Sequence, residues 1–172
     1  MNKLLVLKKM GFKISWNLIV IGLYGHDEIP PLITRLDIVN YLDSMLTDVD
    51  EQTDNMIALI CEKDDNTKFD KLLEEFASRD NSNIDIQKRK WRAYLLKNLI
   101  DNISEDSLQG LLELMDFWVS MGIQPNCPQA FPNSNNKKSI QEYFTQASYE
   151  FYLNKNREWL DEEIQNVIKL ER

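Results

Sequence analysis

The sequence predicts an all-α protein. Apolar residues recur at spacings of three and four along nearly the whole chain, which is the helical period. Only 5 glycines and 5 prolines occur in 172 residues, which disfavours a turn-rich β-sandwich or barrel. We expect about eight helices in an antiparallel bundle or a short stack of helix pairs. They are expected to form a single domain, residues 1–172, with possible lobes at 1–82 and 83–172.

Four helices are expected in the first half of the chain. Ser15 can cap the first, which ends at Gly25, and Thr34 with Asp37 forms an acidic capping box for the second. The third is expected at about 53–62, and the fourth opens at residue 66 or 67. The apolar stripes of the first, second and fourth helices are Trp16, Ile19, Val20 and Leu23; Ile38, Leu42 and Met45; and Phe69, Leu72, Leu73 and Phe76.

Four more helices are expected after a loop at 81–83. A long helix comes first, and Ser104 is expected to cap the next one, which stops at Gly122. Ser139 and Glu142 form another capping box, and a last helix follows it. The apolar positions are Trp91, Tyr94, Leu95 and Leu99; Leu108, Leu111, Leu112, Met115, Trp118 and Val119; Ile140, Tyr143, Phe144, Ala147 and Phe151; and Trp159, Leu160, Ile164, Val167 and Ile168.

Nucleophilic and metal-binding residues are scarce. Cys61 ends an apolar run and is expected to be a buried, inert thiol, whereas Cys127 lies between two prolines of a loop and can be exposed. His26 is the only histidine, so at most one Cys–His pair can form and a structural zinc site is excluded. The acidic stretch 48–54 lacks the turn glycine and the final glutamate of a calcium loop. We expect no metal, no cofactor and no enzymatic activity.

The chain shows no pattern typical of export or membrane insertion. The apolar stretch at 4–7 is shorter than the core of a signal peptide. The uncharged run at 18–24 is far below the ~20 residues needed to span a bilayer. Because two isolated cysteines also favour a reducing compartment, we expect a cytoplasmic protein.

The charge of the chain limits the partners that it can bind. The formal net charge is −8, which disfavours nucleic acid and anionic membranes as partners and permits a basic protein. Residues 26–86 hold 16 acids and 5 bases. These acids either solvate the surface or steer a basic partner toward it. The candidate contact residues are Asp43, Asp48, Asp50, Glu51, Asp54, Glu62, Asp64 and Asp65, with Trp118 as an interface residue beside the helix end at Gly122.

A basic run at 88–92 follows the acidic region. Such a run is typical of nucleic-acid binding, but Trp91 interrupts it, and Lys88 and Arg92 lie one helical turn apart. We expect instead an internal electrostatic match with the acidic helices before it. The irregular segment 122–138, which contains three prolines and four asparagines, is either a functional loop or a crossing between lobes.

Several short motifs occur in order along nearly the whole chain. They are Ile14-Ser15-Trp16 with Gly22, Leu36-Asp37-Ile38, Lys90-Trp91-Arg92 with Leu95-Leu96, Phe117-Trp118 followed by the loop of Pro125 and Pro128, Glu142-Tyr143, and Trp159. This order resembles a family of small bacterial helical proteins of unknown function. Some relatives in that family are immunity proteins encoded beside contact-dependent or polymorphic toxins. The resemblance implies no catalytic residues and no particular toxin.

The resemblance and the charge together predict an immunity protein. Many toxins of this kind are nucleases with basic surfaces that bind RNA or DNA, and an acidic inhibitor can occupy such a surface in place of phosphate. The expected function is therefore to bind and neutralise a cognate basic toxin domain by charge complementarity. One alternative is a helical interaction or adaptor protein without a toxin partner. Another is an enzyme that uses carboxylates placed across a cleft.

Overall fold

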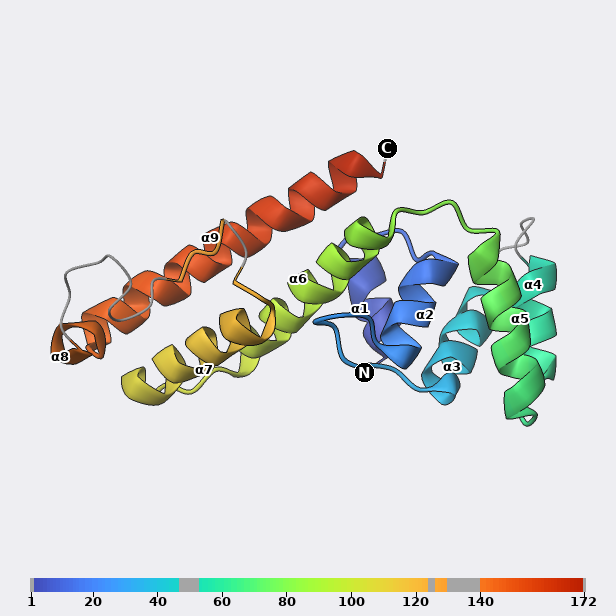
Figure 1. The fold of residues 1–172 in the computed structure, drawn as a ribbon, viewed down its shortest axis with the longest axis horizontal. Helices are drawn as coiled ribbons and strands as arrows, with labels where there is room; N and C mark the ends of the chain where they lie inside the picture. Colours follow the sequence, from blue (N-terminus) through green and yellow to red (C-terminus); the bar gives the residue numbers. More distant parts are fainter. Residues whose placement is uncertain (1, 47–52, 124–125, 130–139, 172) are drawn as a thin grey trace. The chain divides into compact units, whose positions relative to one another are not determined.

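The computed structural model describes residues 2–46, 53–123, 126–129 and 140–171, and these ranges form helices without any named β-strand (Figure 1). The all-α class predicted from the sequence is confirmed. The helices are α1 (Lys3–Lys9), α2 (Trp16–Tyr24), α3 (Arg35–Met45), α4 (Thr53–Cys61), α5 (Asn66–Ser78), α6 (Ile84–Asn102), α7 (Ser107–Ser120), α8 (Ile140–Tyr143) and α9 (Gln146–Leu170).

The chain divides into two compact units. Unit 1 comprises Met1–Trp91 and Leu170–Arg172, and unit 2 comprises Arg92–Lys169. The division falls inside α6 and at the last residue of α9. The loop at 81–83, where the sequence allows a lobe boundary, therefore lies within unit 1.

Side-chain caps determine where the helices of unit 1 begin. The Ser15 hydroxyl accepts a hydrogen bond from the backbone N–H of Leu18 at 3.2 Å. Thr34 and Asp37 form the expected capping box, which opens α3. Asp65 caps α5 by accepting from the backbone N–H of Lys68 at 3.1 Å, and the helix begins at Asn66, as expected. Caps of this kind satisfy backbone donors that the first helical turn leaves without partners.

Helix α1 is one that the apolar pattern does not predict. It has seven residues, begins after the cap Asn2, and buries Leu4 and Leu7. The Asn2 side chain also donates to the backbone oxygen of Asp37 in α3 at 2.6 Å. Because a helix this short is unstable by itself in water, its contacts with α3 determine it more than the propensity of its residues.

The core of unit 1 forms where α2 meets Trp91. The Trp91 side chain is fully buried, and its indole nitrogen Nε1 donates to the backbone oxygen of Leu18 at 2.8 Å. Gly22 lies against the ring, since a Cβ at that position would be 2.3 Å from Trp91 Cζ2. The backbone oxygen of Gly22 accepts from Leu32 and Ile33 at 2.6 and 2.9 Å. Position 22 therefore has no room for any side chain.

The basic run pairs within the chain. The Lys88 ammonium lies 2.9 Å from Asp27 Oδ2 and 3.1 Å from Glu28 Oε2. Both carboxylates belong to the acidic region that precedes the run, so the expected internal match is confirmed for Lys88. They come from the loop after α2, however, and not from a helix.

Lys90 is the most deeply buried charge of unit 1. Its ammonium contacts the Glu171 carboxylate and donates to Gln87 Oε1 and to the backbone oxygen of Lys13, both at 2.7 Å. Burial lowers the pKa of Lys90, while the Glu171 carboxylate acts in the opposite direction. Lys13 also donates from its ammonium to the backbone oxygen of Glu171 at 2.7 Å. The end of the chain is thus held against unit 1 by buried and half-buried polar contacts.

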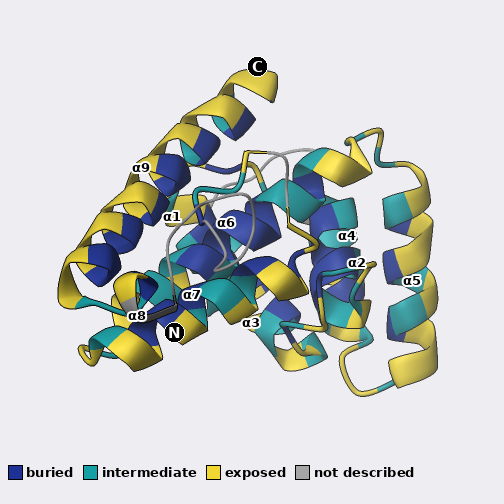
Figure 2. Ribbon diagram, turned by 60° about the vertical axis from the view of Figure 1, so that its left-hand side comes forward, coloured by how far each residue is buried: buried dark blue, intermediate teal, exposed yellow. Residues whose placement is uncertain are grey.

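The core of unit 2 joins residues of α7, α8 and α9, with apolar residues of α6 packed against it. Its buried members are Leu111, Leu114, Tyr143, Tyr149, Tyr152 and Leu153. Helix α9 is continuous over 25 residues and buries one face (Figure 2). The apolar pattern of the sequence predicts two helices here. The stretch from Phe151 to Trp159 has no glycine or proline to interrupt the helix, and Ser139 of the expected capping box lies outside the described residues.

The start of α7 also differs from expectation. Asp106 caps this helix by accepting from the backbone N–H of Gln109 at 2.9 Å. Ser104, the expected cap, lies two residues earlier, and its hydroxyl accepts from the backbone N–H of Asp106 at 3.2 Å. The end at Gly122 is as expected, because a φ of +74° suits glycine.

The tyrosines predict how the fold responds to alkali. Burial is the main cause that raises the pKa of all six, to about 12 for Tyr24 and Tyr41; the others are Tyr94, Tyr143, Tyr149 and Tyr152. A raised folded pKa means that the unfolded chain loses these protons first. Their stabilisation is therefore complete below the unfolded pKa of 10.0 and is lost as the pH rises toward about 12.

We expect unfolding in alkali, with tyrosinate absorbance and loss of helical circular dichroism rising together above pH 10.0. Lys90 acts in the opposite direction, because its lowered pKa makes the folded state gain stability as the pH rises toward the ordinary lysine pKa of 10.5, but it is one group against six. Titration of the tyrosines at an ordinary pKa with the helices intact would contradict this prediction.

Candidate functional site: the acidic surface of α3 to α5

Two of the predicted acidic residues lie on either side of the link between α3 and α4. Asp43 is exposed near the end of α3, and Asp54 is exposed in the first turn of α4. Neither carboxylate makes an ion pair with a described residue. Asp48, Asp50 and Glu51 belong to the same predicted set, but they lie outside the described residues, as does most of the acidic stretch 48–54. No ion pair with a described residue therefore offsets the negative charge of Asp43 and Asp54.

The remaining acids gather at the turn from α4 to α5. Lys68 Nζ lies 3.6 Å from Glu62 Oε2 and 3.5 Å from Asp65 Oδ2, which offsets part of their charge. The hydrogen bond from the Lys68 backbone N–H is the main cause that lowers the pKa of Asp65. Asp64 is exposed and has no ion pair with a described residue.

The structure thus separates the predicted set into two groups along α4. Asp43 and Asp54 lie toward the start of this nine-residue helix, and Glu62, Asp64 and Asp65 lie at or just beyond its end. A helix of that length measures about 13 Å. We define the acidic surface as Asp43, Asp54 and Asp64, the exposed members without an ion pair among the described residues.

Trp118 does not belong to this surface. It is fully buried in unit 2, where its Nε1 donates to Asn156 Oδ1 at 2.7 Å and its ring meets Trp159 edge to face at 4.8 Å. The expectation that Trp118 serves as an interface residue therefore fails for this structure. Its place at the helix end suggests exposure, but it shares one face of α7 with buried Leu111 and Leu114.

The Trp118–Asn156 contact continues into a buried polar network. Asn156 Nδ2 donates to the backbone oxygen of Tyr152 at 2.8 Å and to Gln129 Oε1 at 3.3 Å. Gln129 Nε2 in turn donates to the Tyr143 hydroxyl. Gln129 is part of the irregular segment 122–138, so at this residue the segment contributes to the core of unit 2.

We expect Asn156→Leu to destabilise unit 2 by about 2 kcal/mol, because the buried Trp118 indole loses its acceptor and the buried Gln129 Oε1 loses the Asn156 donor. Urea unfolding followed by tryptophan fluorescence measures this. Asn154→Leu is the matched control, since Asn154 is exposed on the same helix. Equal midpoints for both variants would contradict the role of the network.

A cavity of about 440 Å³ lies in unit 1 and is lined by residues of α1 to α4. Its lining is largely apolar and includes Met45 and Met56, each two residues beyond Asp43 and Asp54 respectively. Lys8 and Lys13 also line it, so a cationic group would be repelled there. The apolar pattern of the sequence does not predict this cavity, although it includes Trp16, which is half-buried at the cavity wall.

The residues with potential nucleophilic or metal chemistry are dispersed. Cys61 is exposed, contrary to expectation, because it lies two residues from buried Leu59 and so faces away from it on α4. Burial raises the pKa of the Cys127 thiol, and His26 Nδ1 lies 3.0 Å from Asp27 Oδ2. Within the described ranges, no three His, Cys, Asp or Glu side chains are grouped so as to hold a metal ion.

The fold and these residues define a helical protein with exposed carboxylates on α3, on α4 and in the turn after α4. Residues 5–164 match a family described as uncharacterized protein conserved in bacteria (DUF2247), and the chain belongs to that family. The bacterial family of unknown function expected from the sequence is confirmed at this level. No curated protein and no solved structure matches the chain. In the part of the chain that the structure describes, no helix combines the length and the apolar character needed to cross a bilayer.

Proposed function

We propose that this chain is a cytoplasmic immunity protein that binds and neutralises a cognate basic toxin domain, most simply a nuclease. One observation carries the proposal: Asp43, Asp54 and Asp64 are exposed on neighbouring elements of unit 1 and have no ion pair with a described residue. Carboxylates offset by lysines would present little field to a partner. No described lysine or arginine pairs with these three carboxylates, so their charge adds to the field of a chain of net charge −8.

The charge would act in two ways. It raises the rate of encounter with a positively charged partner by roughly 10- to 1,000-fold over an uncharged surface. In the complex, the carboxylates occupy lysines and arginines that otherwise bind the phosphates of RNA or DNA, so substrate and inhibitor compete. No reaction by the immunity protein is required.

The proposal predicts protection of cells by this chain. The probe is the C-terminal domain of a secreted protein encoded beside this gene, expressed in a host with or without the chain. We expect growth to be restored by the natural sequence and to be lost or strongly reduced with Asp43→Asn, Asp54→Asn and Asp64→Asn combined. Steering is weakened because the variant removes all three carboxylates of the acidic surface.

A matched control separates location from net charge. Asp85→Asn, Asp161→Asn and Glu162→Gln combined removes the same number of charges from exposed positions on α6 and α9. This variant should protect as the natural sequence does. Equal loss in both variants, or no toxin gene beside this one, would contradict the proposal.

A further inference from the structure

Helix α7 carries more apolar surface than the core of unit 2 covers. Leu111, Leu114 and Trp118 are fully buried on one face. Three further apolar side chains remain exposed, with Leu108 at 50%, Leu112 at 37% and Val119 at 58%. Their spacings of four and seven residues place them together on an adjacent face of the helix. We call Leu108, Leu112 and Val119 the α7 stripe.

The stripe is not needed by the core beside it. Leu111 and Leu114 already join the buried cluster of unit 2, and Met115 packs against it from the edge. Single exposed apolar residues are common in proteins. Three on one helical face at these spacings instead form the pattern by which helices contact one another in complexes.

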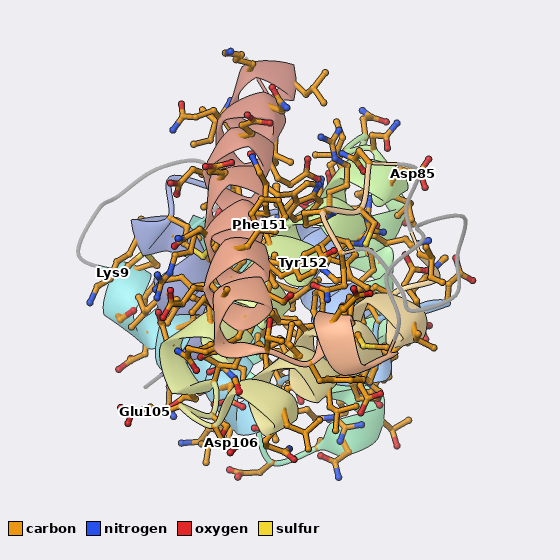
Figure 3. All side chains as sticks on the ribbon, turned by 90° about the vertical axis from the view of Figure 1, so that its left-hand side faces the viewer. Lys9, Asp85, Glu105, Asp106, Phe151 and Tyr152 are labelled. Atoms are coloured by element: carbon orange, nitrogen blue, oxygen red, sulfur yellow. The ribbon has the colours of Figure 1, made fainter. Side chains whose placement is uncertain are left out.

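The segment of chain that carries the stripe is acidic. Residues 98–123 contain five acids and no lysine or arginine. Asp116 lies one turn from both Leu112 and Val119, is exposed, and has no ion pair with a described residue. Glu105 and Asp106 lead into α7 at its start and are exposed as well (Figure 3).

We propose that the α7 stripe is a docking surface for a basic amphipathic helix of a partner protein. Apolar side chains of that helix cover Leu108, Leu112 and Val119, and its lysines or arginines meet Asp116 and Glu105. A second copy of this chain fits less well, because a symmetric contact between two α7 helices would bring Asp116 near its own counterpart. The inference goes beyond the proposed function: it concerns unit 2 and requires no toxin.

The test uses a synthetic peptide of leucine and lysine, about four helical turns long, in which the leucines share one face. A second peptide has the same composition in an order that scatters the leucines. Fluorescence anisotropy with the full chain should show the amphipathic peptide binding at least about tenfold more tightly, since both carry the same charge and only one can cover the stripe.

Variants locate the site. Leu112→Gln with Val119→Gln should weaken binding of the amphipathic peptide about tenfold, because much of the covered apolar area is lost. The matched control is Leu36→Gln with Ile57→Gln, which alters two exposed apolar residues of unit 1. Urea unfolding should show both double variants folded, since all four side chains are exposed.

Three results would overturn the inference. If the scattered peptide bound as tightly as the amphipathic one, general charge attraction would account for the binding. Equal weakening by the unit 1 variant would place the site elsewhere. Sedimentation equilibrium showing a dimer that Leu112→Gln disrupts would identify a second copy as the occupant.

Discussion

Replacing Glu171 by alanine should destabilise the protein by about 3 kcal/mol, although this residue is the second from the end of the chain. The Lys90 ammonium is fully buried and contacts the Glu171 carboxylate. Without that carboxylate, a positive charge remains buried with only neutral hydrogen-bond acceptors, Gln87 Oε1 and the backbone oxygen of Lys13. Urea unfolding followed by circular dichroism measures the loss.

A double variant shows whether charge is the cause. Lys90→Met combined with Glu171→Leu replaces the buried pair by apolar groups and should recover most of the lost stability. Asp27→Ala is the control for an exposed pair, since Asp27 is exposed beside Lys88, and it should cost clearly less stability than Glu171→Ala. If the double variant were as unstable as Glu171→Ala, packing of the chain end and not charge would be responsible.

Gly22→Ala should destabilise unit 1 by about 3 kcal/mol. Inside a helix, this exchange ordinarily stabilises by about 1 kcal/mol, because alanine is the better helix former. Here the added Cβ would lie 2.3 Å from Trp91 Cζ2 and 3.1 Å from Ile33 Cδ1. Since Trp91 is fully buried and bonded to Leu18, the ring cannot move aside without disturbing the core of unit 1.

Gly122→Ala provides the comparison for Gly22→Ala. Gly122 has a φ of +74°, and no atom lies within 4 Å of a Cβ at that position. The expected cost is therefore only the backbone strain of about 1 kcal/mol. Thermal unfolding of both variants measures the difference, and a Gly22→Ala variant as stable as the natural chain would contradict the close contact with Trp91.

Local signals in the sequence were sufficient for most of the helices. Capping and termination depend on one or two residues that the sequence shows directly. Both ends of α2, at Ser15 and Gly25, and the start of α3 at Thr34 can therefore be predicted. Helix α1 cannot, because its stability comes from packing against α3. The sequence predicts two helices in place of the single long α9, because the pattern of apolar residues weakens around Lys155, where buried Asn156 is held by polar contacts.

The site could be predicted only in part. The surplus of acids in residues 26–86 is visible from composition. Which of these carboxylates form ion pairs depends on neighbours in three dimensions. Lys68 pairs with Glu62 and Asp65 and does not pair with Asp64. The burial of Trp118 and the exposure of the α7 stripe also could not be predicted. Both lie on the wide apolar face of α7, and the sequence does not reveal which part of that face the core covers.

The central claim is that Asp43, Asp54 and Asp64 attract a basic partner, and the rate of association with the neighbouring-gene toxin domain tests it most directly. Stopped-flow mixing at salt concentrations from roughly 50 mM to roughly 500 mM shortens the screening length from roughly 14 Å to roughly 4 Å. We predict that the rate falls steeply over this range, and that neutralising the three aspartates flattens the dependence while the control variant on α6 and α9 does not. A rate that is insensitive to salt, or equally sensitive in the natural and neutralised chains, would contradict the claim.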